Sequence, residues 1–174
     1  FATQNPIEQE GTYPLPEAQL DRFLMKVVID YPTMEDEQQI VSGVTAAAGG
    51  KGLNPKSVSQ VCDSASIIEA QKTTAQVSVV PEVVDYALRL TRFTRTAPGM
   101  SLGAGTRGAI SLIQVAKAYA VISGRSHVIP DDVKSAAIPV FRHRVQVTPE
   151  VAISGEGVDD LLIKSLASVE APRA

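Results

Sequence analysis

The sequence predicts a mainly α fold, in which a helical bundle at residues 32–147 follows the last strands and a helix of an α/β core. Three observations support this prediction. Residues 107–123 carry apolar side chains at the i, i+3, i+4, i+7 spacing of an amphipathic helix. A second helix begins with Pro81 and has acids in its first half and arginines in its second, which complements the helix dipole. The β-branched run Met25–Ile29 is typical of a strand.

Residues 1–31 are interpreted as the end of the α/β core. A polar pair ending in Asn5 follows the first apolar residues, and Pro6 then stops regular strand pairing. A domain boundary is expected at Pro32, which ends the last strand. The predicted elements are a strand at Phe1–Thr3, a loop at residues 10–16, a short helix at Glu17–Phe23 and a strand at Met25–Ile29.

Two helices are expected in the first half of the bundle. Thr33 can cap a helix that runs to the next pair of glycines, with Asp36 at the capping-box position. Asp63 is a suitable N-cap for a helix at Ser64–Thr74. Residues 51–61, between the two helices, are compatible with a short capped helix or with an irregular connection.

A glycine-rich loop at residues 96–106 leads into the amphipathic helix. Arg107 lies in the first turn of that helix, where a cation opposes the positive end of the dipole at a cost of roughly a few tenths of a kcal/mol. A bound phosphate would offset this cost. The preceding helix carries three arginines that we interpret as a solvated face in preference to a binding site: Arg89, Arg92 and Arg95.

The C-terminal third is predicted to contain two further helices. Pro130 opens the first, and Pro139 should end or kink it. Residues 146–157 are expected to be a connector. The helix at residues 158–168 carries an apolar stripe, which we expect to dock on the core domain or on a neighbouring subunit. Residues 148–174 are assigned to a C-terminal extension.

Composition restricts the classes of function. The 174 residues include 16 basic and 19 acidic side chains, and the net charge of −3 gives no electrostatic case for nucleic-acid binding. No apolar run approaches the ~20 residues of a membrane-spanning helix, so no membrane insertion is expected. The single Cys62 fits a reducing, cytoplasmic compartment. His127 and His143 lack metal ligands at suitable spacing, so they are interpreted as surface or packing residues and no metal site is expected.

Two stretches carry a resemblance to a known family. The first is Ala2–Pro6 followed by Glu10–Phe23. The second is the loop ending at Arg107, which is similar to a Gly-Ala-Ser-Pro-Arg motif except that Gly105-Thr106 replaces Ser-Pro. With these stretches the chain resembles the second half of the P-loop NTPase core and the helical lid domain of the MoxR family of AAA+ ATPases.

The resemblance implies roles for three side chains. Asn5 matches the sensor-1 residue, whose amide can both donate and accept hydrogen bonds and so orient an attacking water. Arg22 matches the arginine finger, which is offered to the ATP of a neighbouring subunit and neutralises charge on the transferring phosphoryl group. Arg107 matches the sensor-2 residue of the lid, acting either in its own subunit or in trans.

The resemblance also implies a function for the full-length protein. ATP and Mg²⁺ would be its cofactors, and it would act in chaperone-like remodelling or metal insertion. It would assemble into a ring, commonly a hexamer, and proteins with a von Willebrand factor A domain would be possible partners. The sequence contains no Gly-x-x-x-x-Gly-Lys-Ser/Thr motif. We therefore expect this chain to be the C-terminal portion of a longer ATPase and to bind no nucleotide tightly by itself.

Two alternatives remain at this point. The chain could be an independent helical interaction module that uses the arginine face and the apolar helix at residues 158–168. It could also be part of a related magnesium-chelatase or helicase-type ATPase subunit, which would share the lid and sensors. A phosphate-binding motif roughly 150–200 residues upstream of Phe1 would favour an ATPase over the module.

Overall fold

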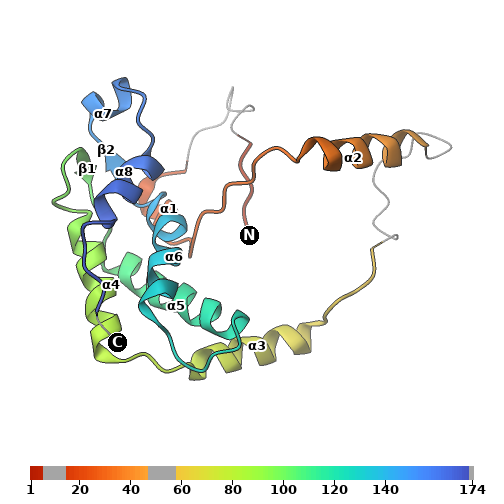
Figure 1. Cartoon of the computed structure of the whole chain (residues 1–174), viewed down its shortest axis with the longest axis horizontal. Helices are drawn as coiled ribbons and strands as arrows, with labels where there is room; N and C mark the ends of the chain where they lie inside the picture. Colours follow the sequence, from red (N-terminus) through yellow and green to blue (C-terminus); the bar gives the residue numbers. More distant parts are fainter. Residues whose placement is uncertain (6–14, 47–57, 173–174) are drawn as a thin grey trace. The chain divides into compact units, whose positions relative to one another are not determined.

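The computed structural model describes residues 1–5, 15–46 and 58–172. The chain divides into two compact units, one containing residues 1–26 and 74–174 and the other containing residues 27–73. The first unit holds both strands and most of the helices (Figure 1).

Three helices form the centre of the first unit: α4 (Pro81–Phe93), α5 (Thr106–Ile122) and α6 (Pro130–Phe141). Helix α5 packs against both α4 and α6 (Figure 1). Many of the buried positions on α5 and α6 are alanine or valine, so the helix axes can approach closely. The predicted mainly α fold with a helical bundle is confirmed. The largest fully buried apolar side chains are Tyr86, Phe141, Leu90, Leu112, Leu162, Val133 and Val140.

A small antiparallel ribbon is a feature that the sequence did not predict. Strand β1 (Met100–Leu102) lies inside the glycine-rich loop and pairs with β2 (Gln146–Val147). Gly103 permits this path, because a Cβ atom there would lie 2.5 Å from the Cα of Arg95. Strands of two or three residues are too short to show an alternating pattern. The short helix α7 (Pro149–Ile153) follows, within the predicted connector.

Helix α8 (Val158–Leu166) docks within its own chain. Its apolar stripe joins the core of the first unit, where Leu161, Leu162 and Leu166 are buried. Helix α6 is among its neighbours. The prediction that this stripe docks on another domain or subunit is therefore wrong. The amphipathic pattern indicated that the stripe needs a partner, but it carried no information about which one.

Helix α6 continues past Pro139 and ends at Phe141, so Pro139 does not end it. The residue lies in the last turn, where carbonyl groups have no acceptor role left inside the helix. Its carbonyl oxygen instead accepts a hydrogen bond from the backbone N–H of Lys26, at 2.8 Å. Proline has no N–H group, so the helix lacks one internal hydrogen bond at this position and nevertheless continues for two more residues.

The strands predicted at Phe1–Thr3 and Met25–Ile29 are wrong for this structure. Neither segment pairs with another strand in the ranges that the structure describes. A β-branched run favours an extended backbone, but a strand also needs a neighbour for its N–H and C=O groups. The predicted helix at Glu17–Phe23 is the single turn α1 (Glu17–Leu20), and turns follow it at residues 21–24.

The second unit contains helix α2 (Met34–Ala46) and most of α3 (Ser64–Gln76). Both predicted caps are confirmed. The backbone N–H of Asp36 donates to Thr33 Oγ1 at 3.2 Å, and the N–H of Ser66 donates to Asp63 Oδ1 at 2.8 Å. The ambiguous segment at residues 51–61 lies mostly outside the described residues, as does the glycine pair expected to end the first of these helices.

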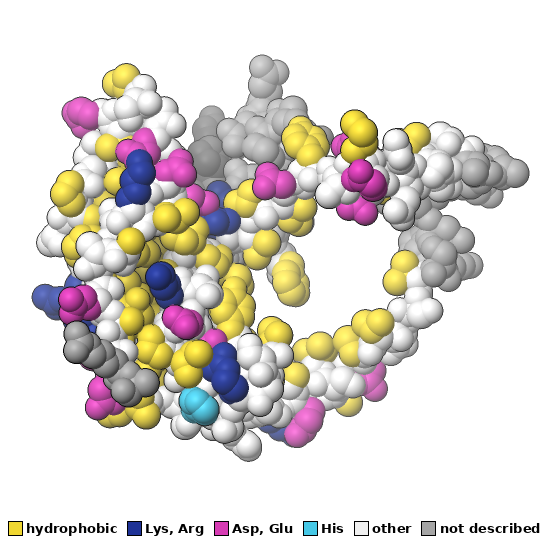
Figure 2. Space-filling view, in the orientation of Figure 1, with side chains coloured by type: hydrophobic (Ala, Val, Ile, Leu, Met, Phe, Trp, Pro, Cys, Tyr) yellow, Lys and Arg dark blue, Asp and Glu magenta, His cyan; other side chains and the backbone are white. Residues whose placement is uncertain are grey.

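The surface of the first unit is mixed in character. Figure 2 shows apolar, basic and acidic side chains interspersed over the face that carries α4 and α8. Among the described residues, no helix combines the length and apolar character that crossing a membrane requires. In the same ranges, no group of three or more His, Cys, Asp or Glu side chains could hold a metal ion.

Candidate functional site

Arg22 lies in the turn that follows α1. Its backbone N–H donates to Gln19 O at 3.1 Å, and the N–H of Phe23 donates to Leu20 O at 3.0 Å, which closes the turn. The Arg22 side chain is exposed. Within the described ranges its guanidinium has no hydrogen-bond or ion-pair partner.

The adjacent residue, Asp21, is paired with two arginines. Its Oδ2 lies 2.7 Å from Arg107 Nη1, and its Oδ1 accepts from Arg144 Nε at 3.1 Å. The two arginines differ in environment: the Arg107 side chain is 54% exposed, whereas that of Arg144 is 1% exposed. Asp21 thus connects the turn that carries Arg22 to the first turn of α5 and to the end of α6.

Arg144 contacts the backbone of the same turn. Its guanidinium donates to the carbonyl oxygens of Asp21 at 3.1 Å and Leu24 at 3.2 Å, and also to that of Phe23. Two further acceptors lie within the bundle, Val140 O at 2.6 Å and Ser111 Oγ at 3.1 Å. Burial lowers the pKa of the guanidinium and Asp21 opposes that shift, but arginine starts so high that it remains charged near neutral pH.

Two neighbours of Arg144 extend these contacts. His143 Nε2 lies 3.2 Å from Phe23 O, and Arg142 Nη1 reaches Lys26 O at 3.4 Å. Because a carbonyl can only accept, we assign the ring proton to Nε2. Burial lowers the pKa of His143, the bond to Phe23 O opposes this shift, and the ring is neutral at pH 7. We call Arg142, His143 and Arg144 the 142–144 clasp.

Sequence reasoning missed the clasp and the role of Asp21. Arg144 lies four residues beyond Val140, on the buried stripe that also contains Val133 and Ala137 of α6. That spacing could have indicated that Arg144 points into the bundle. Nothing in the sequence indicates which groups accept hydrogen bonds from Arg144. One of them, the carbonyl of Asp21, lies more than 120 residues away in the chain.

The structure connects two of the three predicted site residues through Asp21. Arg22 is next to Asp21 in the chain, and Arg107 is bonded to Asp21. Asn5 is exposed, in a segment that forms neither helix nor strand. The sensor-1 role of Asn5 stays a prediction.

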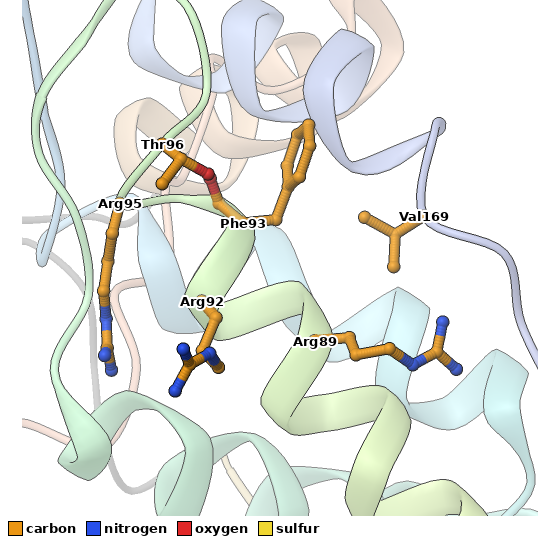
Figure 3. Close-up of a pocket in the computed structure, with 6 residues that line it drawn as sticks. All are labelled: Arg89, Arg92, Phe93, Arg95, Thr96 and Val169. Atoms are coloured by element: carbon orange, nitrogen blue, oxygen red, sulfur yellow. The ribbon is translucent and has the colours of Figure 1, made fainter.

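A second candidate site is the pocket at the C-terminal end of α4, shown in Figure 3. Two of its three arginines already have protein acceptors. Arg89 pairs with Asp85 at 2.8 Å and donates to Glu170 O, while Arg95 Nε donates to Ala104 O at 2.9 Å. Arg92 has no partner among the described residues. Arg89 therefore holds the C-terminal segment, and Arg95 holds the loop after α4. The lining residues of the pocket are Arg89, Arg92, Phe93, Arg95, Thr96 and Val169.

Comparisons with known proteins match both ends of the chain to ATPase families. Residues 92–163 match the AAA lid domain, and residues 1–25 match the ATPase family associated with various cellular activities (AAA). Chaperone MoxR1 of Mycobacterium tuberculosis is 34% identical over 172 residues, covering 88% of this chain and 44% of that protein. Protein MoxR of Paracoccus denitrificans is 28% identical and matches 100% of this chain with 56% of its own length.

A solved structure supports the same relationship. A candidate ATPase from Cytophaga hutchinsonii superimposes with a TM-score of 0.85 at 32% identity, covering 99% of this chain and 53% of that one. A Bacillus subtilis protein, YeaC, is 35% identical over 99% of this chain and 52% of its own length. The chain thus spans about half the length of the curated relatives it matches.

Proposed function

The chain belongs to the MoxR-type AAA+ ATPases, and from that membership we propose that it supplies Arg22 and Arg107 to ATP hydrolysis by the whole protein. Arg22 is the arginine finger for the ATP held by a neighbouring subunit. Arg107 is the sensor-2 residue that links the lid to the phosphates. Asn5 is the sensor-1 residue that orients the attacking water.

The observation that carries the proposal is the contrast between Arg22 and its neighbour Asp21. Asp21 is paired twice within the unit, whereas the guanidinium of Arg22 is exposed and has no partner in the described ranges. A cation held on a turn and unpaired within the described ranges is suited to a partner outside the subunit. In GTPases an arginine of this kind contributes about 10³–10⁵ in rate.

The cofactors of the whole protein would be ATP and Mg²⁺, which supply the phosphoryl group and neutralise its charge. The residues present here suit the phosphate oxygens, because guanidinium groups bind them through charge-assisted hydrogen bonds. Arg107 is half exposed and has one ion-pair partner in the described part of the chain, so it can turn toward an anion. The sequence has no Gly-x-x-x-x-Gly-Lys-Ser/Thr cradle, so these arginines would meet nucleotide that is held elsewhere.

An arginine that acts in trans requires an assembly in which each subunit faces the next. Head-to-tail contacts of this kind close into a ring, and a hexamer is the proposed form. Chaperone-type remodelling is the proposed activity, supported by the likeness to Chaperone MoxR1. Proteins with a von Willebrand factor A domain are the proposed partners. A cytoplasmic location is consistent with the free, exposed thiol of Cys62.

The test is ATP turnover by the full-length protein carrying Arg22→Ala. We expect a loss of at least about 100-fold in kcat with normal assembly, because charge on the phosphoryl group is no longer neutralised. Arg92→Ala is the matched control, since it removes another exposed arginine without a partner in the described part of the chain. Normal turnover by Arg22→Ala would exclude the finger assignment.

The ATPase assignment is favoured over an independent interaction module because family matches occur at both ends of the chain. A magnesium-chelatase-type subunit would use the same arginines with different partners. Turnover with Arg22→Ala therefore tests the chemistry common to both ATPase assignments.

A further inference from the structure

We propose that Asp21 and Arg144 are positioning residues for Arg22, so that the 142–144 clasp of the lid sets the direction in which a subunit presents its finger to the next one. This inference rests on the proposed finger role of Arg22. It adds two residues that touch neither nucleotide nor the reacting atoms.

The turn that carries Arg22 has little stability of its own. Helix α1 is only four residues long, has no side-chain cap and buries none of its residues. Residues 21–24 form turns and bends and belong to no helix or strand. One outward contact of α1 is a hydrogen bond from Gln146 Nε2 to the carboxylate of Glu17. A four-residue helix is far below the length at which helices are stable in isolation, so the turn depends on contacts with the bundle.

The clasp supplies those contacts. Arg144 donates to three carbonyl groups within residues 21–24 and to the Asp21 side chain. His143 adds a second bond to Phe23 O, and Lys26 N–H is bonded to Pro139 O just before the clasp. The planar guanidinium offers five N–H donors in a fixed fork, so it determines the relative positions of several acceptors at once.

The charge of Arg144 explains why Asp21 is needed to hold the turn. A buried guanidinium needs a compensating carboxylate, and Asp21 is the one bonded to Arg144. Because Arg144 is almost fully buried, this contact persists when the exposed Arg107 turns away from Asp21. Arg107 can therefore engage a phosphate while the turn stays fixed. The backbone of Arg22 is held by both of its neighbours, and its own side chain is left for the adjoining subunit.

A double-mutant cycle in the full-length protein tests the proposal, with kcat and KM for ATP as readouts. Asp21→Asn should lower kcat up to about 100-fold, because a small misplacement of a catalytic group has effects of that size. KM should not rise, since loss of the Asp21 charge leaves Arg107 free to meet the phosphates. In an Arg22→Ala background the same Asp21→Asn change should alter kcat by less than about twofold, because there is no finger left to misplace.

Three further variants complete the design. Asp21→Glu keeps the charge and should retain most of the activity. Arg144→Lys keeps the charge but lacks the fork, so it should behave like Asp21→Asn. If Asp21→Asn does not fold, these two variants replace it in the double-mutant cycle. Arg92→Ala should leave kcat unchanged in both backgrounds.

Each result decides one question. If Asp21→Asn lowers kcat by the same factor with and without Arg22, Asp21 acts independently of the finger and the proposal is overturned. Unchanged kcat for both Asp21→Asn and Arg144→Lys also overturns it. Normal turnover by Arg22→Ala alone would instead remove the proposed function on which this inference rests.

Discussion

Asp21 Oδ2 lies 2.7 Å from Arg107 Nη1, although the two residues are 86 positions apart in the sequence. This ion pair joins the turn beside the proposed finger to the first turn of α5. A cation in the first turn of a helix is unfavourable by itself, and Asp21 offsets part of that cost. The pair is half exposed, so an anion can compete for Arg107.

Loss of Arg107 should affect activity far more than stability. An exposed ion pair contributes about 0–1 kcal/mol, so Arg107→Ala should lower the free energy of unfolding by less than about 1 kcal/mol. ATP turnover of the full-length protein should fall at least about tenfold if Arg107 meets the phosphates. Chemical denaturation and steady-state kinetics measure the two effects. A large loss of stability with unchanged turnover would contradict the sensor-2 role.

Loss of Arg144 should have a much larger effect on stability. Arg144→Met removes a buried cation and leaves carbonyl groups of residues 21–24 without their donor. Removing one partner of a buried pair typically costs about 3–5 kcal/mol, and Arg107 still compensates Asp21, so we expect about 3 kcal/mol. The midpoint of chemical denaturation measures this loss. A midpoint equal to that of Arg107→Ala would show that burial of Arg144 is unimportant.

The stability of the first unit should fall in mildly acidic solution because of His143. Burial holds the pKa of His143 below its usual value. As the pH falls below about 6.5, the unfolded chain binds a proton at this ring before the folded chain does. The free energy of unfolding therefore decreases until the pH passes the pKa in the folded state, where the decrease levels off.

The variant His143→Asn isolates this effect of pH. Asparagine does not titrate, so the midpoint of denaturation of this variant should change less between pH 7.5 and 5.5 than that of the parent protein. The nearby charged groups are Arg144, Lys26 and Asp21. An identical pH profile for both proteins would contradict the assignment.

Gly103 and Gly105 provide a matched pair for testing the loop before α5. A Cβ atom at Gly103 would lie 2.5 Å from Arg95 Cα and 2.6 Å from Arg95 N, so backbone has to move. We expect Gly103→Ala to cost about 1–3 kcal/mol. A Cβ at Gly105 meets nothing within 4 Å, and its φ of −78° suits any residue. Gly105 is the N-cap of α5, where alanine is less favourable than glycine, so Gly105→Ala should cost up to about 1 kcal/mol and less than Gly103→Ala, as thermal denaturation of both variants can show.

The sequence identified the longer helices but not α7 or the contacts that connect the helices. Thr33 and Asp63 were assigned correctly as caps because a cap is a local interaction within four residues. Local patterns also gave the bulk of α4, α5 and α8. Arg22 and Arg107 were identified through a family resemblance. The predicted site did not include Asp21, the residue that connects them.

That missing residue could not be identified because its role is nonlocal. Asp21 has the sequence appearance of an ordinary surface acid, and only the folded chain brings Arg107 and Arg144 to it. The strands β1 and β2 were missed for a related reason. They are two or three residues long, and their pairing joins Met100 to Val147 across most of the bundle sequence.

The bond between Lys26 and Pro139 also bears on engineering of this chain. Lys26 is fastened to α6 at 2.8 Å, and Ala75 is fastened to α5 by a 3.1 Å bond from Lys117 Nζ. The chain therefore leaves the first unit after Lys26 and has returned to it by Ala75, and both of these residues are hydrogen-bonded to helices of that unit. Each doubling of the length of a flexible loop costs only about 0.6 kcal/mol in closure entropy. A reporter domain inserted between these two residues should therefore leave both hydrogen bonds intact.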